Sequence, residues 1–147
     1  MSATNALETS ILNHLLANAA IANVGDATGL PAAATVGSCQ LSLHTVALDD
    51  TDTLLTADEC DYTGYARQTV ARSGSGWTVS GNNASNAALI QFGEKTGGAD
   101  DVAVHCGIGL IATGDVLQIH ADLGADLTIS DGVNPQFAIG ALDITMD

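Results

Sequence analysis

The stretch DYTGYARQTVARSGSGWTVSGNNASNAALIQF, residues 61–92, shows the pattern that decides the fold. It contains three short runs, YARQTVAR, GWTVSG and NAALIQF, which are separated by Gly, Asn and Ser. Short runs with period-two alternation, bounded by such residues, predict antiparallel strands joined by turns. The same stretch holds the single Trp, two of the three basic side chains (Arg67 and Arg72) and one of the seventeen carboxylates. A binding site or a structural role could explain this grouping.

The strand pattern continues on both sides of this stretch. CQLSLHTV (39–46) alternates before it, and VAVHCGIGLIA (102–112), DVLQIHADL (115–123) and ALDITM (141–146) follow it. Seven or eight short strands with Gly, Asn and Asp at the turns predict a mainly β fold. The expected architecture is an antiparallel, jelly-roll-like β-sandwich.

The segment TNALETSILNHLLANAAI is the only region with a convincing helical period. Leu7, Ile11 and Leu15 form its main apolar stripe, with two further leucines, Leu12 and Leu16, beside it. Asn5 and Glu8 have the spacing of a helix-capping pair. We therefore expect one N-terminal α-helix.

Length and patterning predict one domain over residues 1–147. Within it, we assign residues 1–22 to the helix, 23–38 to a connecting segment and 39–147 to the strands. The glycines and the proline between residues 25 and 31 mark the end of helical structure.

The charge balance excludes several classes of partner. The net charge is −14, with three basic residues and mostly Asp among the acids. Nucleic acids and anionic membrane surfaces need a basic surface, so neither partner is expected. No apolar run approaches a membrane span, so membrane insertion is not predicted either. An Asp-rich, Lys-poor composition is similar to that of proteins from extreme halophiles.

Clustered carboxylates raise the possibility of a bound cation. Asp49, Asp50 and Asp52 lie close together, and clustered carboxylates suit Ca²⁺ or Mg²⁺. The spacing is not that of an EF-hand, and clusters also arise by composition in so acidic a chain. Solvated loops are therefore the alternative to a Ca²⁺ or Mg²⁺ site at these three residues.

No arrangement of residues predicts catalysis. His105 and Cys106 are adjacent in a predicted strand and so point to opposite faces. The G-x-S-x-G motif is absent, as is the lysine of a phosphate-binding loop. Cys39, Cys60 and Cys106 lack zinc spacing and are interpreted as small buried residues. We expect a protein that is not an enzyme and needs no cofactor.

Tyr65, Arg67 and Gln68 are the candidate contact residues of the central stretch. On a strand, Tyr65 and Arg67 share one face, which would suit contact between subunits. Arg67 could instead bind a carboxylate within the chain and fix the fold. The second interpretation would explain why a chain with so few bases keeps an arginine here.

Several segments resemble one family of viral proteins. These are GYARQ (64–68), SN at 85–86 leading into LIQF (89–92), and LDIT (142–145). They look like small structural proteins of tailed bacteriophages and archaeal tailed viruses, which include tail-fibre proteins and outer capsid decorations. The resemblance implies a virion role and a β-sandwich, and it implies no catalytic residue.

The sequence therefore favours a capsid decoration protein, a cement or turret, of a tailed virus with a halophilic host. It would lie on the outer capsid surface as a trimer or pentamer. Its partners would be the major capsid protein or tail proteins. Leu7, Ile11 and Leu15 would either cover one end of the sandwich or pack between copies. A tail-fibre or baseplate component is the first alternative. A soluble carbohydrate- or metal-binding module is the second, although the chain has few aromatic side chains from which to build a sugar site.

Overall fold

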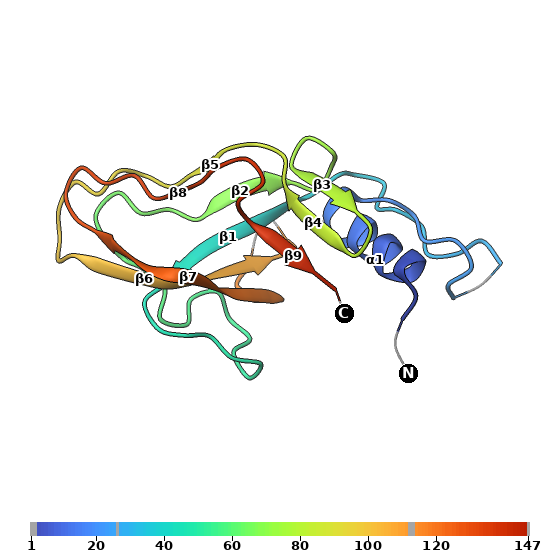
Figure 1. Ribbon diagram of the computed structural model, residues 1–147, viewed down its shortest axis with the longest axis horizontal. Coiled ribbons are helices and arrows are strands. Elements are labelled where there is room, and N and C mark those ends of the chain that lie inside the picture. The colour runs from blue at the N-terminus through green and yellow to red at the C-terminus, as the bar shows by residue number, and fades with distance from the viewer. Residues whose placement is uncertain (1–2, 26, 112–113, 147) are drawn as a thin grey trace. The chain divides into compact units, whose positions relative to one another are not determined.

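The computed structural model describes residues 3–25, 27–111 and 114–146. In these residues the chain forms one helix and nine strands (Figure 1). They are α1 (Asn5–Ala17), β1 (Ser38–His44), β2 (Gln68–Ala71), β3 (Trp77–Ser80), β4 (Asn83–Asn86), β5 (Ile90–Gln91), β6 (Asp101–Gly109), β7 (Ile119–Ile129), β8 (Gln136–Phe137) and β9 (Asp143–Thr145). The β1–β6, β6–β7, β3–β4 and β4–β9 pairs are all antiparallel. The prediction of a mainly β, sandwich-like fold with one N-terminal helix is confirmed.

The chain divides into two compact units. Unit 1 comprises Met1–Ser38, Ala71–Ile90 and Phe137–Asp147, and unit 2 comprises Cys39–Val70 and Gln91–Gln136. The chain thus passes between the units four times, each time within a strand. The prediction of one domain over residues 1–147 stays a prediction. No helix in the described residues has the length and apolar character needed to cross a bilayer.

Unit 1 consists of α1 and a three-stranded sheet in the order β3-β4-β9. The helix packs against β3 and β4 (Figure 1). Leu12 and Leu16 point inward and are at most 1% exposed, and the sheet contributes buried side chains that include Trp77 and Ala84. Burial of these side chains provides the hydrophobic stabilisation of the unit.

Helix α1 is shorter than the assigned region, and its N-cap differs from the predicted one. Thr4, not Asn5, is the N-cap, and its side chain accepts a hydrogen bond from the Leu7 amide. The helix ends because Asn18 adopts a left-handed conformation (φ 53°). The side chain of Asn18 then forms two hydrogen bonds with the backbone of Ala33.

Unit 2 contains the four-stranded sheet, in the order β2-β1-β6-β7. Both faces of β1 are covered, whereas the sequence alternation predicted one polar, exposed face. The polar face can be buried because its side chains Ser42 and His44, both fully buried, form a hydrogen bond with each other. A satisfied polar pair can occupy a core position that sequence alternation assigns to the surface.

Gly107 makes room for this buried pair. It lies opposite Ser42 in the β1–β6 register. A Cβ atom at this position would lie 2.7 Å from His44 Nε2 and 2.8 Å from the Ser42 hydroxyl oxygen. The glycine is therefore required by the close approach of side chains rather than by a turn.

Two strands were not anticipated, β4 and β8. The sequence of β4, NASN, has turn-forming composition, and we interpreted it as part of a turn. It forms a strand because it pairs with both β3 and β9, which overrides its weak local preference. Strand β8 has only two residues and carries no periodic signal.

Candidate functional site

Arg67 forms a charged network within unit 2. Its Nε donates to Glu59 Oε1 (2.8 Å) and its Nη2 to Glu59 Oε2 (2.7 Å), which is a bidentate ion pair. Nη2 also donates to Asp115 Oδ1 at 2.8 Å. The expected carboxylate clamp is therefore present. Because the Arg67 and Glu59 side chains are only 18% and 14% exposed, water screens this pair weakly.

Tyr65 belongs to the same network, whereas Gln68 does not. The Tyr65 hydroxyl donates to Glu59 Oε1 (2.7 Å) and accepts from the Leu43 amide (3.0 Å), and burial raises the pKa of Tyr65. The Gln68 amide donates to its neighbour Ala66 instead. The structure thus brings together two of the three predicted residues, with Glu59 as their shared partner.

The network anchors the acidic loop, which we define as residues 49–61 (teal in Figure 1). The Thr56 hydroxyl donates to Asp115, and the Leu117 amide donates to the Thr53 carbonyl. Hydrogen bonding from Thr56, with a contribution from Arg67, lowers the pKa of Asp115. Leu55 packs with Leu117 beneath the loop. These contacts hold the loop in one conformation on its own unit.

Asp49 and Asp52 form hydrogen bonds within the acidic loop. Asp49 accepts from both the amide and the hydroxyl of Thr51, which lowers the pKa of Asp49, and Asp52 accepts from the Asp49 amide. Together with Asp50 and His120 they line an open pocket of about 410 Å³. In the described residues, no three His, Cys, Asp or Glu side chains converge as a metal site requires. The cation proposed for these three aspartates stays a prediction.

The histidines of unit 2 have structural partners. Nδ1 of His44 lies 2.7 Å from the Ala57 carbonyl, so it carries the proton, and Nε2 accepts from Ser42. Burial lowers the pKa of His44. His105 Nδ1 accepts from the Leu48 amide, and its Nε2 faces Asp122 at 3.4 Å. A hydrogen-bonded serine and histidine also occur in catalytic triads. Here both Ser42 and His44 are fully buried, so a substrate could not reach the serine hydroxyl.

The other two cations also have fixed partners. Arg72, in unit 1, donates to the Leu15 carbonyl (2.6 Å) and the His14 carbonyl (2.8 Å) at the end of α1. Lys95, in unit 2, is 1% exposed and contacts Asp131 (2.5 Å) and Asp100 (3.3 Å). The sequence analysis did not identify Lys95 as important, although it is the only lysine of the chain. All three bases therefore hold the fold together.

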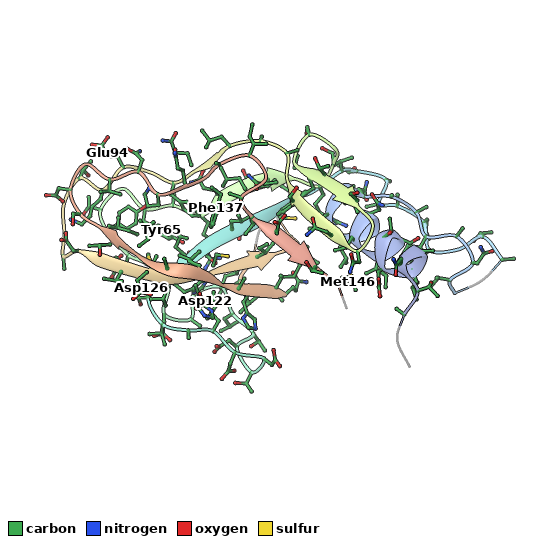
Figure 2. The ribbon with its side chains drawn as sticks, viewed as in Figure 1. Tyr65, Glu94, Asp122, Asp126, Phe137 and Met146 are labelled. Carbon is green, nitrogen blue, oxygen red and sulfur yellow. The ribbon has the colours of Figure 1, made fainter. Side chains whose placement is uncertain are left out.

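Three of the five aromatic side chains are buried, and Tyr65 and Phe137 are partly exposed. Tyr62, Trp77 and Phe92 are at most 3% exposed, and the ring of Tyr65 stacks on Phe92 with centroids 5.9 Å apart. Figure 2 shows Tyr65 inside unit 2. A carbohydrate-binding module needs free aromatic faces, and these rings do not provide them.

The comparison with protein families identifies the kind of protein to which this chain belongs. The family described as podophage GP4 fiber I protein gp80 matches residues 2–145. The chain belongs to this family. No curated protein matches the chain. The fiber I family is one of phage structural proteins, so the predicted kinship with fibre-type virion proteins is confirmed at that level. Membership also favours a structural, non-enzymatic role.

The helix residues proposed as contacts are at least partly exposed. Leu7 is 39% exposed, and Ile11 and Leu15 are half-buried, whereas the buried stripe is Leu12 and Leu16. The sequence analysis placed Leu12 and Leu16 beside the main apolar stripe, and periodicity did not show which leucines face inward because five apolar residues of similar size occupy two adjacent stripes. Contact between copies through Leu7, Ile11 and Leu15 stays a prediction for this member of the fiber I family.

The three cysteines are buried, as expected, and none of them forms a disulfide. Burial raises the pKa of Cys60 to about 12 and that of Cys106 to about 11. A buried thiol with such a pKa is protonated at neutral pH and reacts poorly. These cysteines therefore stabilise the core of unit 2 as small apolar residues.

Proposed function

We propose that this chain is a self-assembling structural subunit of a virion and that it acts without catalysis as part of a tail fibre. The match to the fiber I family over residues 2–145 is the observation that supports it. The internal use of all three cations agrees with a protein whose side chains maintain a fold rather than transform a substrate. Copies assemble as a trimer or pentamer, in which the partly exposed Leu7, Ile11 and Leu15 pack between neighbours.

A capsid decoration protein, either a cement or a turret, is the second candidate. The sequence has no internal repeat of the kind that fibre shafts use, and this favours a compact decoration. In that position the subunit binds the major capsid protein, and in the tail it binds other tail proteins. The acidic loop faces the medium in both cases, because its carboxylates cost least in water.

The acidity supports a salty environment for this virion. A net charge of −14 repels itself within the chain, and molar salt shortens the Debye length to about 3 Å. We infer a virus of a halophilic host, either bacterial or archaeal.

Two measurements test the proposal. Light scattering on the purified chain in molar salt gives the mass, and we expect a trimer or pentamer. An antibody raised against the chain is then applied to purified virions and viewed by electron microscopy. Labelling of the tail supports the fibre, and labelling over the capsid supports decoration. If the chain is a monomer in light scattering and the antibody labels neither the tail nor the capsid, both candidate functions are contradicted.

A further inference from the structure

Unit 1 carries an exposed apolar turn that the fold does not require. Residues 138–141, AIGA, form this turn, in which the Ala141 amide donates to the Ala138 carbonyl (3.0 Å). Gly140 has φ +73°, which only glycine adopts easily, so this position is explained by the backbone. The backbone does not explain why residue 139 is an isoleucine, because its side chain is 71% exposed at the tip of the turn. Polar residues are usual at such positions, and they would satisfy the turn equally well.

Asn86 fixes a second apolar segment beside this turn. Its side chain is buried, with Nδ2 donating to the carbonyls of Ala88 and Ala138 at 2.8 Å each. Its Oδ1 accepts from the Leu142 amide at 2.9 Å. Next to Ala88 lies Leu89, which is 52% exposed. One buried amide thus holds two exposed apolar segments together in a rigid arrangement.

We define the neutral patch as Ala88, Leu89, Ala138, Ile139 and Ala141, all of which are exposed. It lies in two long uncharged stretches of the sequence. Residues 73–93 and 132–142 contain no Asp, Glu, Lys, Arg or His, although the chain has seventeen carboxylates. A concentrated apolar surface without charge is characteristic of the centre of a protein interface.

The charges of the chain indicate which partner would bind the neutral patch. Arg67, Arg72 and Lys95 are all bound to groups of their own unit, so no base is left to attract the carboxylates of another copy. Copies with a charge of −14 repel one another wherever carboxylates face carboxylates. At direct contact the separation is within the Debye length of about 3 Å, so even in molar salt copies associate most readily through a surface that lacks carboxylates. We propose that the neutral patch is the surface through which copies of this chain associate, an inference that rests on the self-assembly proposed above.

The test measures mass by light scattering in molar salt for four variants. Ile139→Asp and Leu89→Asp place a carboxylate on the neutral patch. Leu54→Asp is the matched control, because Leu54 is 50% exposed but lies in the acidic loop of unit 2. Leu7→Asp tests the proposed contact residues of α1 separately. Fluorescence of the buried Trp77 verifies that each variant retains the fold of unit 1.

We expect the wild-type chain and Leu54→Asp to form the same oligomer. Both patch variants should dissociate, with a dissociation constant higher by about tenfold or more, because a like charge is placed at the contact. If the patch variants keep the wild-type mass, the neutral patch is not the contact, while self-assembly itself survives. The same conclusion follows if only Leu7→Asp dissociates, or if Leu54→Asp dissociates equally. If the wild-type chain is a monomer at all concentrations, both self-assembly and the role of the patch are refuted.

Discussion

Unit 1 and unit 2 differ sharply in charge. Unit 1 has four of the seventeen carboxylates and one of the three bases, whereas unit 2 has thirteen carboxylates and two bases. Unit 2 alone therefore carries most of the net charge, and Figure 2 labels two of its carboxylates, Asp122 and Asp126, on β7. The acidic loop belongs to unit 2, and the neutral patch belongs to unit 1.

The difference teaches that an acidic protein need not be acidic everywhere. Unit 2 combines a carboxylate-rich surface with ion pairs formed by two largely buried bases, Arg67 and Lys95. Unit 1 depends instead on a packed helix, with its single base placed at the helix end. If the units are held by different interactions, changes in one should leave the other largely intact, and this can be measured.

The largest effect is expected from Arg67→Met, which removes the base from the network of unit 2. Glu59 would then be a largely buried carboxylate without its ion pair, at a cost of about 3 kcal/mol in the free energy of unfolding. Hydrogen exchange followed by mass spectrometry should show the loss of protection in unit 2. Equal loss of protection in unit 1 would contradict the independence of the units.

A double variant provides the control for this prediction. Glu59→Met alone should also destabilise unit 2, since it leaves Arg67 with only Asp115 as a charged partner. Arg67→Met combined with Glu59→Met should cost less than the sum of the single changes, because neither charge remains unpaired. Simple additivity in urea unfolding would show that the two side chains act separately.

A smaller effect is expected in unit 1 from Arg72→Met. This change leaves the carbonyls of His14 and Leu15 without their guanidinium donor at the negative end of α1, at a cost of about 2 kcal/mol. The fluorescence of Trp77, which is buried in the same unit, should report the loss during urea unfolding. Arg72→Lys keeps the charge but cannot form both bonds in the same way, so it should fall between the wild type and Arg72→Met.

The role of Arg67 illustrates how much the sequence could predict. A scarce base next to a strand-forming aromatic residue suggested a carboxylate clamp, and the clamp exists. Its partners could not be chosen from the sequence. Glu59 is one of several acids in its loop, and Asp115 lies 48 residues away along the chain. Only the pairing of distant strands brings these side chains together.

For the helix, the sequence predicted the element but not which of its side chains are buried. Its existence followed from periodicity, but the identity of its buried face did not, because leucine and isoleucine occupy two adjacent stripes. Asn86 was quoted only as part of a family resemblance. Its importance comes from three backbone groups that it meets in the folded chain, two of them more than 50 residues away. Local composition carries no signal for such long-range hydrogen bonds.

Mild acid should affect unit 2 before unit 1. The folded-state pKa of His44 is lowered by burial, so the unfolded chain binds the proton more tightly, and stability should fall as pH drops below about 6.5. A second loss should follow below about pH 4, as Asp49, Asp100 and Asp115, whose pKa values are also lowered, become protonated. All four groups lie in unit 2.

Two comparisons test this pH dependence. Hydrogen exchange at pH 7 and pH 5 should show weakened protection in unit 2 and little change in unit 1. His44→Gln keeps a donor for the Ala57 carbonyl but cannot titrate, so it should flatten the loss between pH 6.5 and 5. An unchanged slope in that variant would remove His44 as the cause.

The last prediction concerns the thiols of the native protein, which should barely react with a thiol reagent. Cys39, Cys60 and Cys106 all lie in unit 2 and are at most 2% exposed, so a thiol reagent reaches them only when unit 2 opens. At neutral pH the wild-type chain should react far more slowly than the same chain in urea. Arg67→Met should accelerate labelling about 100-fold, the factor that corresponds to about 3 kcal/mol when labelling follows the open population. Arg72→Met acts in unit 1 and should leave the labelling rate near the wild-type value. If both arginine variants accelerate labelling equally, the units open together, and the difference in charge between them does not correspond to a difference in stability.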